Sequence, residues 1–246
     1  MIKVFDKAVM AIDIIASVPG KEWSTEELSK AMKMPVSTTH RILLSLAKHD
    51  ILEQNRETKK FRLGWKLLNW GFVLYKNMDL RQLALPLMRS LTEKTKESSF
   101  LSILLRNEGM IIEKVDAPSP IRYHSEIGTR YPLNRSASAR VLLAYMGEGE
   151  RNAIIDTFDP AIRSLFREEC ERIREQGYAV VRETREIIDV VGIAAPVQDF
   201  TGKKDKAIAI SGPEIRLPPE KIPMYVEWVL EAAEELTQQL IGLKRS

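Results

Sequence analysis

Apolar residues recur at helical spacing in three successive segments near the N-terminus. A first helix is expected from Val4 to Ser17, and Pro19-Gly20 ends it. Ser24, followed by Glu27 three residues later, has the pattern of a capping box and begins a second, short helix. The residues expected to face inward from that helix are Leu28 and Ala31.

A third helix is expected after a tight connection, with Pro35 at its start, where the missing N–H costs nothing. Its apolar stripe consists of Thr39, Ile42, Leu43 and Leu46. The opposite, polar and basic face consists of Ser37, Thr38, His40, Arg41, Ser45 and Lys48. Two short helices of this kind are typical of a helix-turn-helix.

Two short strands are predicted next, at residues 51–53 and 61–63, around a turn at residues 55–58. The basic residues at or beside this turn are Arg56, Lys59, Lys60 and Arg62. Any small helical domain can show amphipathic helices with a solvated basic face. The basic hairpin is what favours a winged helix, and therefore DNA binding.

Large apolar residues crowd the segment that follows. A helix is expected from Leu63 to Tyr75, with Gly64 and Gly71 tolerated within it, and another from Asp79 to Lys96, kinked at Pro86. The apolar surface of the first indicates packing on a second chain. We therefore interpret residues 1–75 as a DNA-binding domain, 76–96 as a linker helix and 97–246 as a second domain.

The second domain has strands at both ends and helices between them. Strands are expected at 98–105, 110–115, 121–123, 178–182, 191–197 and 207–211. Helices are expected at 136–146, 150–158, 161–176 and 218–244, with Gly177 as the C-terminal cap of the third and Gly202 in the turn between the last two strands. This order predicts an α+β fold with an antiparallel sheet.

Composition narrows the class of protein. With 246 residues, 44% hydrophobic and 29% charged, the chain is expected to be a soluble globular protein of one or two domains. Its single cysteine, Cys170, excludes an internal disulfide framework and is read as a packed thiol in preference to a nucleophile. No signal-peptide pattern begins the chain, and no apolar run approaches the roughly 20 residues that span a bilayer. We therefore expect a cytoplasmic protein with no membrane partner.

Charge is distributed unevenly. Residues 1–75 carry 12 Lys and Arg against 8 Asp and Glu, whereas the remainder carries 25 against 26. A small basic domain beside a neutral one fits phosphate contact by the first domain alone, and the modest excess suggests weak binding by one copy.

Five stretches together resemble the IclR family of bacterial transcription regulators, end to end. They are Pro35–Leu43, Phe61–Gly64, Tyr131–Ala144, Glu175–Tyr178, and Gly192–Asp199 with Ala207–Pro213. The resemblance implies an N-terminal winged helix, a dimerising helical linker and a C-terminal, GAF-like effector-binding domain. Members usually bind palindromic operators as dimers or dimers of dimers, and respond to small organic acids or aromatics.

This chain departs from the family pattern at two places. Members commonly have glycine and lysine where this chain has Ala139-Arg140, and many have cysteine where it has Gly192. The first change keeps the positive charge. The second alters the wall of the expected pocket, so the identity of the effector does not carry over.

Arg41 is the leading candidate for a base or phosphate contact in the major groove, with Ser37, Thr38, His40 and Ser45 on the same face. From the wing, Arg56, Lys59 and Lys60 would contact phosphates or the minor groove. Arg62 either joins them or pairs with Glu53.

An anionic effector suits the N-terminus of the helix that starts near Ser136, because free N–H groups and the helix dipole favour a carboxylate there. Family resemblance places the pocket between this helix and the sheet. Its candidate lining is Leu133, Ser136, Ala137, Ser138, Glu183, Gly192, Ala194, Ala209 and Ser211. Two alternatives stay open: Ser136 only caps the helix, and Glu183 either accepts a hydrogen bond from the ligand or pairs with a neighbouring arginine.

Catalysis and cofactor binding find little support. The three histidines show no metal-ligand spacing, and neither a phosphate-binding glycine loop nor a nucleophile elbow is present. We therefore expect a ligand-responsive transcription regulator without cofactor or catalytic residues. The alternatives are a repressor whose C-terminal domain only oligomerises, and an enzyme fused to a winged helix.

Overall fold

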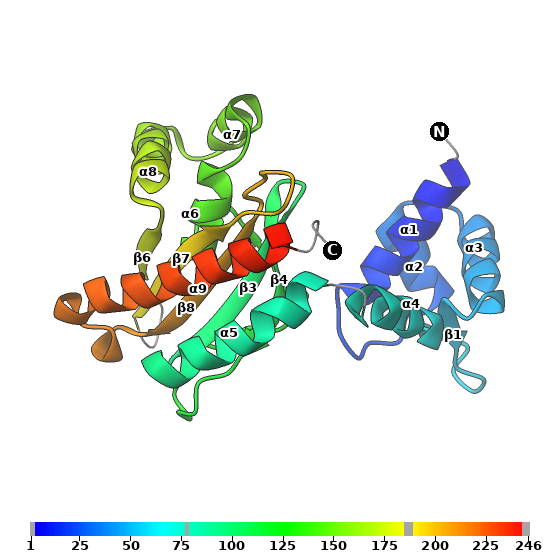
Figure 1. Ribbon diagram of the computed structural model, residues 1–246. Coiled ribbons are helices and arrows are strands. Elements are labelled where there is room, and N and C mark those ends of the chain that lie inside the picture. The colour runs from blue at the N-terminus through cyan, green and yellow to red at the C-terminus, as the bar shows by residue number, and fades with distance from the viewer. Residues whose placement is uncertain (1–2, 77–78, 185–188, 243–246) are drawn as a thin grey trace. The chain divides into compact units, whose positions relative to one another are not determined.

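The computed structural model describes residues 3–76, 79–184 and 189–242, and the chain divides after residue 78 into two compact units (Figure 1). The first unit comprises α1 (Lys3–Ala16), α2 (Thr25–Met32), α3 (Val36–Lys48), β1 (Leu52–Gln54), β2 (Phe61–Leu63) and α4 (Trp65–Lys76). Leu28, Leu43 and Phe61 are completely buried where the first three helices meet the hairpin. The winged helix-turn-helix expected from the sequence is therefore confirmed.

Local predictions in this unit were largely right. The capping box is present, because the backbone N–H of Ser24 donates to the Glu27 carboxylate and that of Glu27 donates to Ser24 Oγ. Ala31 was predicted to face inward but is exposed, and Met32 is buried in its place. Gly64 was predicted inside a helix but precedes α4. A Cβ there would lie 2.2 Å from the carbonyl oxygen of Asp50, so only glycine allows the chain to pass so close.

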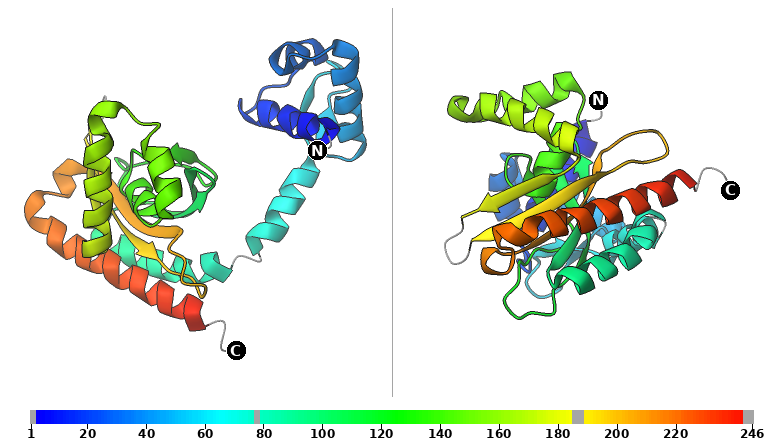
Figure 2. Two further views of the ribbon diagram at one scale, coloured as in Figure 1. Left: turned by 90° about the horizontal axis from the view of Figure 1, so that it is seen from above. Right: turned by 60° about the vertical axis from the view of Figure 1, so that its left-hand side comes forward.

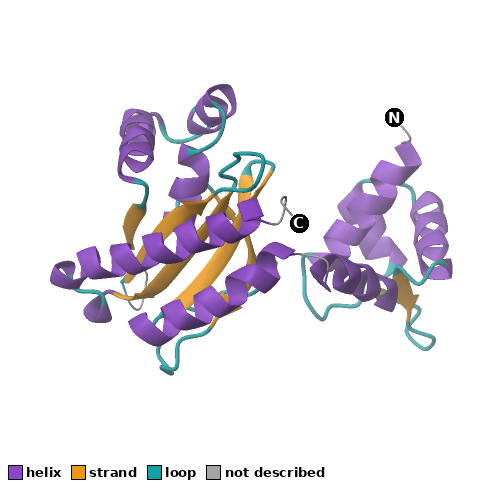
Figure 3. Ribbon diagram, viewed as in Figure 1, coloured by secondary structure: helices purple, strands orange, loops and turns teal. Residues whose placement is uncertain are grey.

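The second unit is built on an antiparallel sheet, which Figure 3 shows beneath its helices. Its strands are β3 (Ser98–Leu105), β4 (Glu108–Val115), β5 (Arg130–Pro132), β6 (Ala179–Glu183), β7 (Val190–Val197) and β8 (Lys206–Pro213). Within the described residues the six strands lie in the order β5-β4-β3-β8-β7-β6. Its helices are α5 (Asp79–Thr95), α6 (Ala137–Ala144), α7 (Glu148–Ile155), α8 (Arg163–Gln176) and α9 (Ile222–Gly242). The α+β prediction is confirmed.

Different helices cover the two faces of this sheet (Figure 2). Successive side chains of a strand point to opposite faces. In β7 and β8, Ala194 and Ala209 face α6 and belong to the apolar core that it shares with α8. The alternate residues Ile193 and Ile210, both completely buried, face the side where α5 and α9 pack. Burial on both faces explains why these strands are almost wholly apolar.

Helix α5, which we expected to be a linker, packs within the second unit. It lies against β3, β4 and α9. Buried hydroxyls join it to the sheet, since Thr92 Oγ1 donates to Ser99 Oγ at 2.8 Å and Ser99 Oγ donates to the Met88 carbonyl at 3.0 Å. The unit therefore begins with this helix.

Two further predictions need correction. Residues 121–123 are not a strand; the carbonyl of Tyr123 accepts a hydrogen bond from Ser98 Oγ, a side-chain contact in place of a ladder, and the third strand is β5. The closing helix was expected from residue 218 but begins at Ile222, because Pro219–Lys221 form a separate 3₁₀ turn. Its expected end at residue 244 lies outside the described residues.

Candidate DNA-binding surface and ligand cavity

Helix α3 presents the polar face that the sequence predicted. Thr39 is completely buried and donates a hydrogen bond to the Pro35 carbonyl, which fixes the register of the helix. The outward residues Ser37, His40, Arg41 and Ser45 are exposed, and Thr38 is half-buried. The Nδ1 atom of His40 lies 3.3 Å from the Oγ1 atom of Thr25, at the start of α2. Within the described residues Arg41 forms no hydrogen bond or ion pair, so its guanidinium is available to a ligand.

The wing is a tight hairpin with free cations at its tip. Asn55 Oδ1 accepts the backbone N–H groups of Glu57 and Thr58, which holds the turn. Arg62 pairs with Glu53 through two hydrogen bonds of 3.2 and 3.0 Å, which is one of the two roles considered for it. The cationic side chains of Arg56, Lys59 and Lys60 are exposed and form no hydrogen bond or ion pair in the described part of the wing.

A cavity of about 180 Å³ lies in the second unit between the start of α6 and the sheet. Six of the nine expected residues line it, namely Ser136, Ala137, Ser138, Glu183, Gly192 and Ser211. The cavity also reaches β3, β4 and β5 and the loops before and after β5, through residues that include Phe100, Ser102, Ile111, Tyr123, Tyr131 and Arg135. The structure thus brings the start of α6 and residues of all six strands to one partly enclosed space.

Three expected lining residues lie elsewhere. Ala194 and Ala209 face each other across β7 and β8, on the same face as the Gly192–Ser211 pair but one step further along. There the body of α6 covers the sheet, and both alanines belong to the core beneath it. Leu133 is 1% exposed and belongs to the same core. Their role is packing.

The first turn of α6 faces the cavity with unused amides. Ser136 caps the helix, since its Oγ accepts the Ala139 N–H at 3.2 Å. The first amides of a helix have no partner within it, and those of Ala137 and Ser138 find no acceptor among the described residues. Gly192 keeps this end open: a Cβ there would lie 3.2 Å from Ser211 Oγ and 3.8 Å from the Ala137 nitrogen. Ser136 therefore caps α6 and lines the cavity at once.

Tyr131 is a lining residue that the sequence reasoning missed. Its hydroxyl oxygen is buried and has no hydrogen-bond partner of good geometry among the described residues. Burial raises the pKa of Tyr131 to about 12, although the neighbouring hydroxyls of Ser102 and Ser138 act in the opposite direction. Its ring lies over Gly109, its partner in the β4–β5 ladder, where a Cβ would come within 2.2 Å of the ring. Glycine at 109 therefore sets the position of this hydroxyl.

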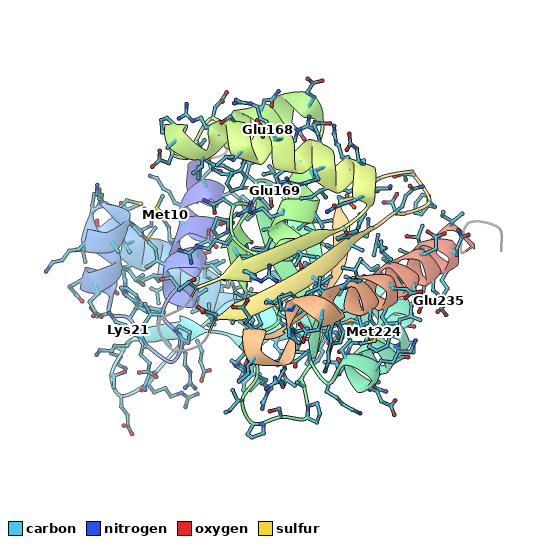
Figure 4. All side chains as sticks on the ribbon, turned by 90° about the vertical axis from the view of Figure 1, so that its left-hand side faces the viewer. Met10, Lys21, Glu168, Glu169, Met224 and Glu235 are labelled. Carbon is cyan, nitrogen blue, oxygen red and sulfur yellow. The ribbon has the colours of Figure 1, made fainter. Side chains whose placement is uncertain are left out.

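Arg135 was also missed, although it lies in the motif that precedes α6. It lines both the cavity and an adjoining open hollow of about 840 Å³. Three other arginines of the hollow have carboxylate partners: Arg122 with Asp116, Arg140 with Glu169 (labelled in Figure 4), and Arg182 with Glu214. Arg135 forms no ion pair within the described part of the chain. Its exposed charge beside the helix end makes this entrance favourable to an anion.

Two other kinds of site are absent from the described residues. No cluster of three or more His, Cys, Asp and Glu side chains among them is arranged to hold a metal ion. None of their helices combines the length and the apolar content that crossing a membrane requires.

Comparison with known proteins gives consistent matches. The IclR helix-turn-helix domain matches residues 4–56, and the family described as "Bacterial transcriptional regulator IclR C-terminal" matches residues 73–238. The HTH-type transcriptional regulators XynR and KdgR of Escherichia coli (strain K12) are similar at 30% and 31% identity. XynR aligns over 98% of each chain, and KdgR over 89% of this chain and 86% of its own.

Solved structures share the fold. The IclR protein of Thermotoga maritima is 25% identical, with a TM-score of 0.70 over 98% of this chain and 100% of its own. An IclR homolog from Microbacterium hydrocarbonoxydans, complexed with 4-hydroxybenzoate, is 24% identical, with a TM-score of 0.80 over 96% and 98%.

Proposed function

The chain belongs to the IclR family of bacterial transcription regulators, and we propose that its affinity for operator DNA is controlled by a small organic ligand bound in the cavity beneath α6. The lining of this cavity carries the proposal. Unused amides, an unpartnered buried hydroxyl and a free arginine converge on it. A domain that served only to oligomerise would gain nothing from such an arrangement, because unpartnered buried polar groups destabilise a fold.

On the DNA side, α3 would read the major groove and the wing would contact the backbone. Arg41 supplies the base or phosphate contact, with Ser37, Thr38, His40 and Ser45 beside it. Arg56, Lys59 and Lys60 approach phosphates from the hairpin. These cations are exposed and free of internal partners in the described residues, which is what a phosphate-binding surface requires.

Two copies would act together. Helix α4 exposes large apolar side chains, with Trp65 74%, Trp70 53% and Phe72 52% exposed. On α1, Met10 (labelled in Figure 4) is 46% exposed. Apolar surfaces of this kind favour burial against a second chain. A dimer would place two α3 helices on one face of the duplex, with half-sites about 34–36 Å apart.

The ligand side rests on chemistry and on relatives. An organic acid or aromatic acid suits the α6 end, where amides and a cation favour negative charge. A protein of the same fold is known in complex with 4-hydroxybenzoate, which supports a small organic ligand in this architecture. By linkage, a ligand that prefers one arrangement of the dimer shifts the spacing of the two α3 helices, and operator affinity follows.

A thermal-shift screen with small carboxylic, sugar and aromatic acids tests the ligand half. A ligand at 100 times its Kd adds about 2.7 kcal/mol of stability, and the same compound should change operator affinity. Stabilisation without any effect on operator binding would contradict control by the ligand. A blank screen would favour the alternative, a repressor whose C-terminal domain only oligomerises.

Arg41→Ala tests the DNA half. The change should weaken specific operator binding by about 1–3 kcal/mol, because it removes a direct contact from the reading helix. Arg172→Ala is the matched control, since it removes the same charge from an exposed position of α8 in the other unit. Operator affinity equal to that of the control would refute the assignment of the reading surface.

A further inference from the structure

Three hydroxyl groups gather on the wall of the cavity. Ser102 and Ser138 line it and are only 1% and 7% exposed. The Tyr131 hydroxyl lies beside both but forms a hydrogen bond of good geometry with neither. A buried hydroxyl that lacks a partner carries a desolvation cost, and each hydroxyl can both donate and accept. A ligand hydroxyl placed here would satisfy the cluster, whereas a hydrocarbon group would leave it unsatisfied.

The other polar groups of the lining favour negative charge. The Ala137 and Ser138 amides lie at the positive end of α6, and Arg135 stands immediately before the capping Ser136. Gly192 leaves the Ala137 amide uncovered. Among the described lining residues Glu183 is the one carboxylate, and it lies on β6, opposite Val190. The helix end is therefore suited to a carboxylate, and the hydroxyl cluster is suited to a neutral polar group.

Size restricts the ligand further. Pockets for drug-sized ligands occupy roughly 300–1,000 Å³, whereas this cavity has about 180 Å³. An acid of a few carbons or a single small ring fits that volume. The carboxylate site and the hydroxyl site share Ser138, so both groups of the ligand must lie close together.

We propose that the ligand is a small hydroxy-carboxylate, whose carboxylate binds the α6 amides and Arg135 and whose hydroxyl binds Tyr131, Ser102 and Ser138. This inference rests on the ligand-binding part of the proposed function and specifies it. Tyr131 then distinguishes a hydroxylated acid from its deoxy analogue, and Arg135 binds both.

Calorimetric titration of the full-length protein with matched pairs tests this specificity. Lactate against propanoate gives the aliphatic pair, 4-hydroxybenzoate against benzoate gives the aromatic pair, and glycerol and ethanolamine lack a carboxylate. At least one hydroxylated acid should bind roughly 10- to 100-fold more tightly than its deoxy partner, because the latter leaves the hydroxyl cluster unsatisfied. The pair that shows the difference tells whether the carbon skeleton is aliphatic or aromatic.

Two variants assign the roles. Tyr131→Phe should abolish the preference within that pair, whereas Tyr145→Phe, a half-buried tyrosine of another pocket, should retain it. Arg135→Ala should weaken the binding of both acids by about tenfold or more. Arg122→Ala is its control, because it lies in the outer hollow but outside the cavity.

A measurement without ligand gives an independent check. Removal of an unpartnered hydroxyl should leave the Tm of Tyr131→Phe unchanged or raise it. A lower Tm would show that the hydroxyl serves the fold, and would overturn the inference. So would equal binding of both members of each pair, binding of glycerol or ethanolamine alone, or no binding by any compound. Equal or non-acid binding that still changes operator affinity would leave the ligand-controlled regulator in place.

Discussion

An ion pair between Glu97 and Arg216 joins the start of β3 to the segment before α9. Arg216 donates from Nε to Oε1 at 2.5 Å and from the terminal nitrogen Nη2 to Oε2 at 2.7 Å. The Glu97 side chain is 1% exposed and that of Arg216 is 31% exposed. The carboxylate also fills the space over Gly212, where a Cβ would lie 2.1 Å from Oε2. Glu97 is therefore enclosed, whereas Arg216 has a path to water.

This difference in exposure predicts that Arg216→Ala and Glu97→Ala lower the free energy of unfolding by different amounts. Arg216→Ala leaves a buried carboxylate without its partner, which costs about 3–5 kcal/mol. Glu97→Ala frees an arginine that can turn into solvent, so the loss is nearer that of its charge-assisted hydrogen bonds, about 1.5–3 kcal/mol. The double variant has no unpaired buried charge. It should be more stable than Arg216→Ala alone.

Urea unfolding followed by circular dichroism measures the free energy of unfolding of the three variants and the wild type. Linear extrapolation to water gives the values to compare. The argument fails if Arg216→Ala lies within about 1 kcal/mol of the wild type, or if the double variant is less stable than Arg216→Ala.

Three further outcomes are expected. Because burial raises the pKa of Tyr131 to about 12, above the value of about 10 for an unfolded tyrosine, ionisation of this residue in the unfolded chain lowers the stability of the fold between about pH 10 and about pH 12. Alkaline unfolding should therefore begin at higher pH in Tyr131→Phe, and an unchanged profile would contradict this. Burial also raises the pKa of the Cys170 thiol to about 11. A disulfide reagent at pH 8 should therefore label Cys170 in the native protein far more slowly than in the unfolded chain. Equal labelling rates would show that the thiol is accessible in the native protein. Gly64→Ala should lower the free energy of unfolding by about 1–3 kcal/mol, because its Cβ would clash with the Asp50 backbone. Gly71→Ala, whose Cβ would meet no atom within 4 Å, should be neutral or stabilise α4 by up to about 1 kcal/mol. Equal effects of the two changes on the free energy of unfolding would refute the packing argument.

Local patterns were sufficient for the first unit. The capping box at Ser24, the proline before α3 and the stripe through Thr39 and Leu43 each act within one or two helical turns, so sequence spacing alone reveals them. The Arg62–Glu53 pair was one of two roles that the sequence left open for Arg62, and the hairpin register places the two residues opposite each other. Ala31 and Gly64 were misread since their positions depend on what packs beside them.

The ligand cavity shows where sequence information ends. Family resemblance placed Gly192, Ala194, Ala209 and Ser211 in the lining of a pocket beside α6, and the structure has all four on one face of the sheet. Which of these residues line the cavity, and which are covered by α6, depends on how far α6 extends over that face. Residue spacing within a strand does not reveal this.

Composition, periodicity and motif order thus predicted the two-part organisation, a reading helix and a helix end suited to an anion. Only the tertiary structure brought Tyr131 and Arg135 to the cavity, withdrew Leu133, Ala194 and Ala209 into the core, and attached α5 to the sheet. The physical reason is that the burial of a group, and whether it has a hydrogen-bond partner, depend on the atoms packed around it. A tyrosine hydroxyl lacks a partner, or a glycine uncovers an amide, only with respect to atoms from distant parts of the chain.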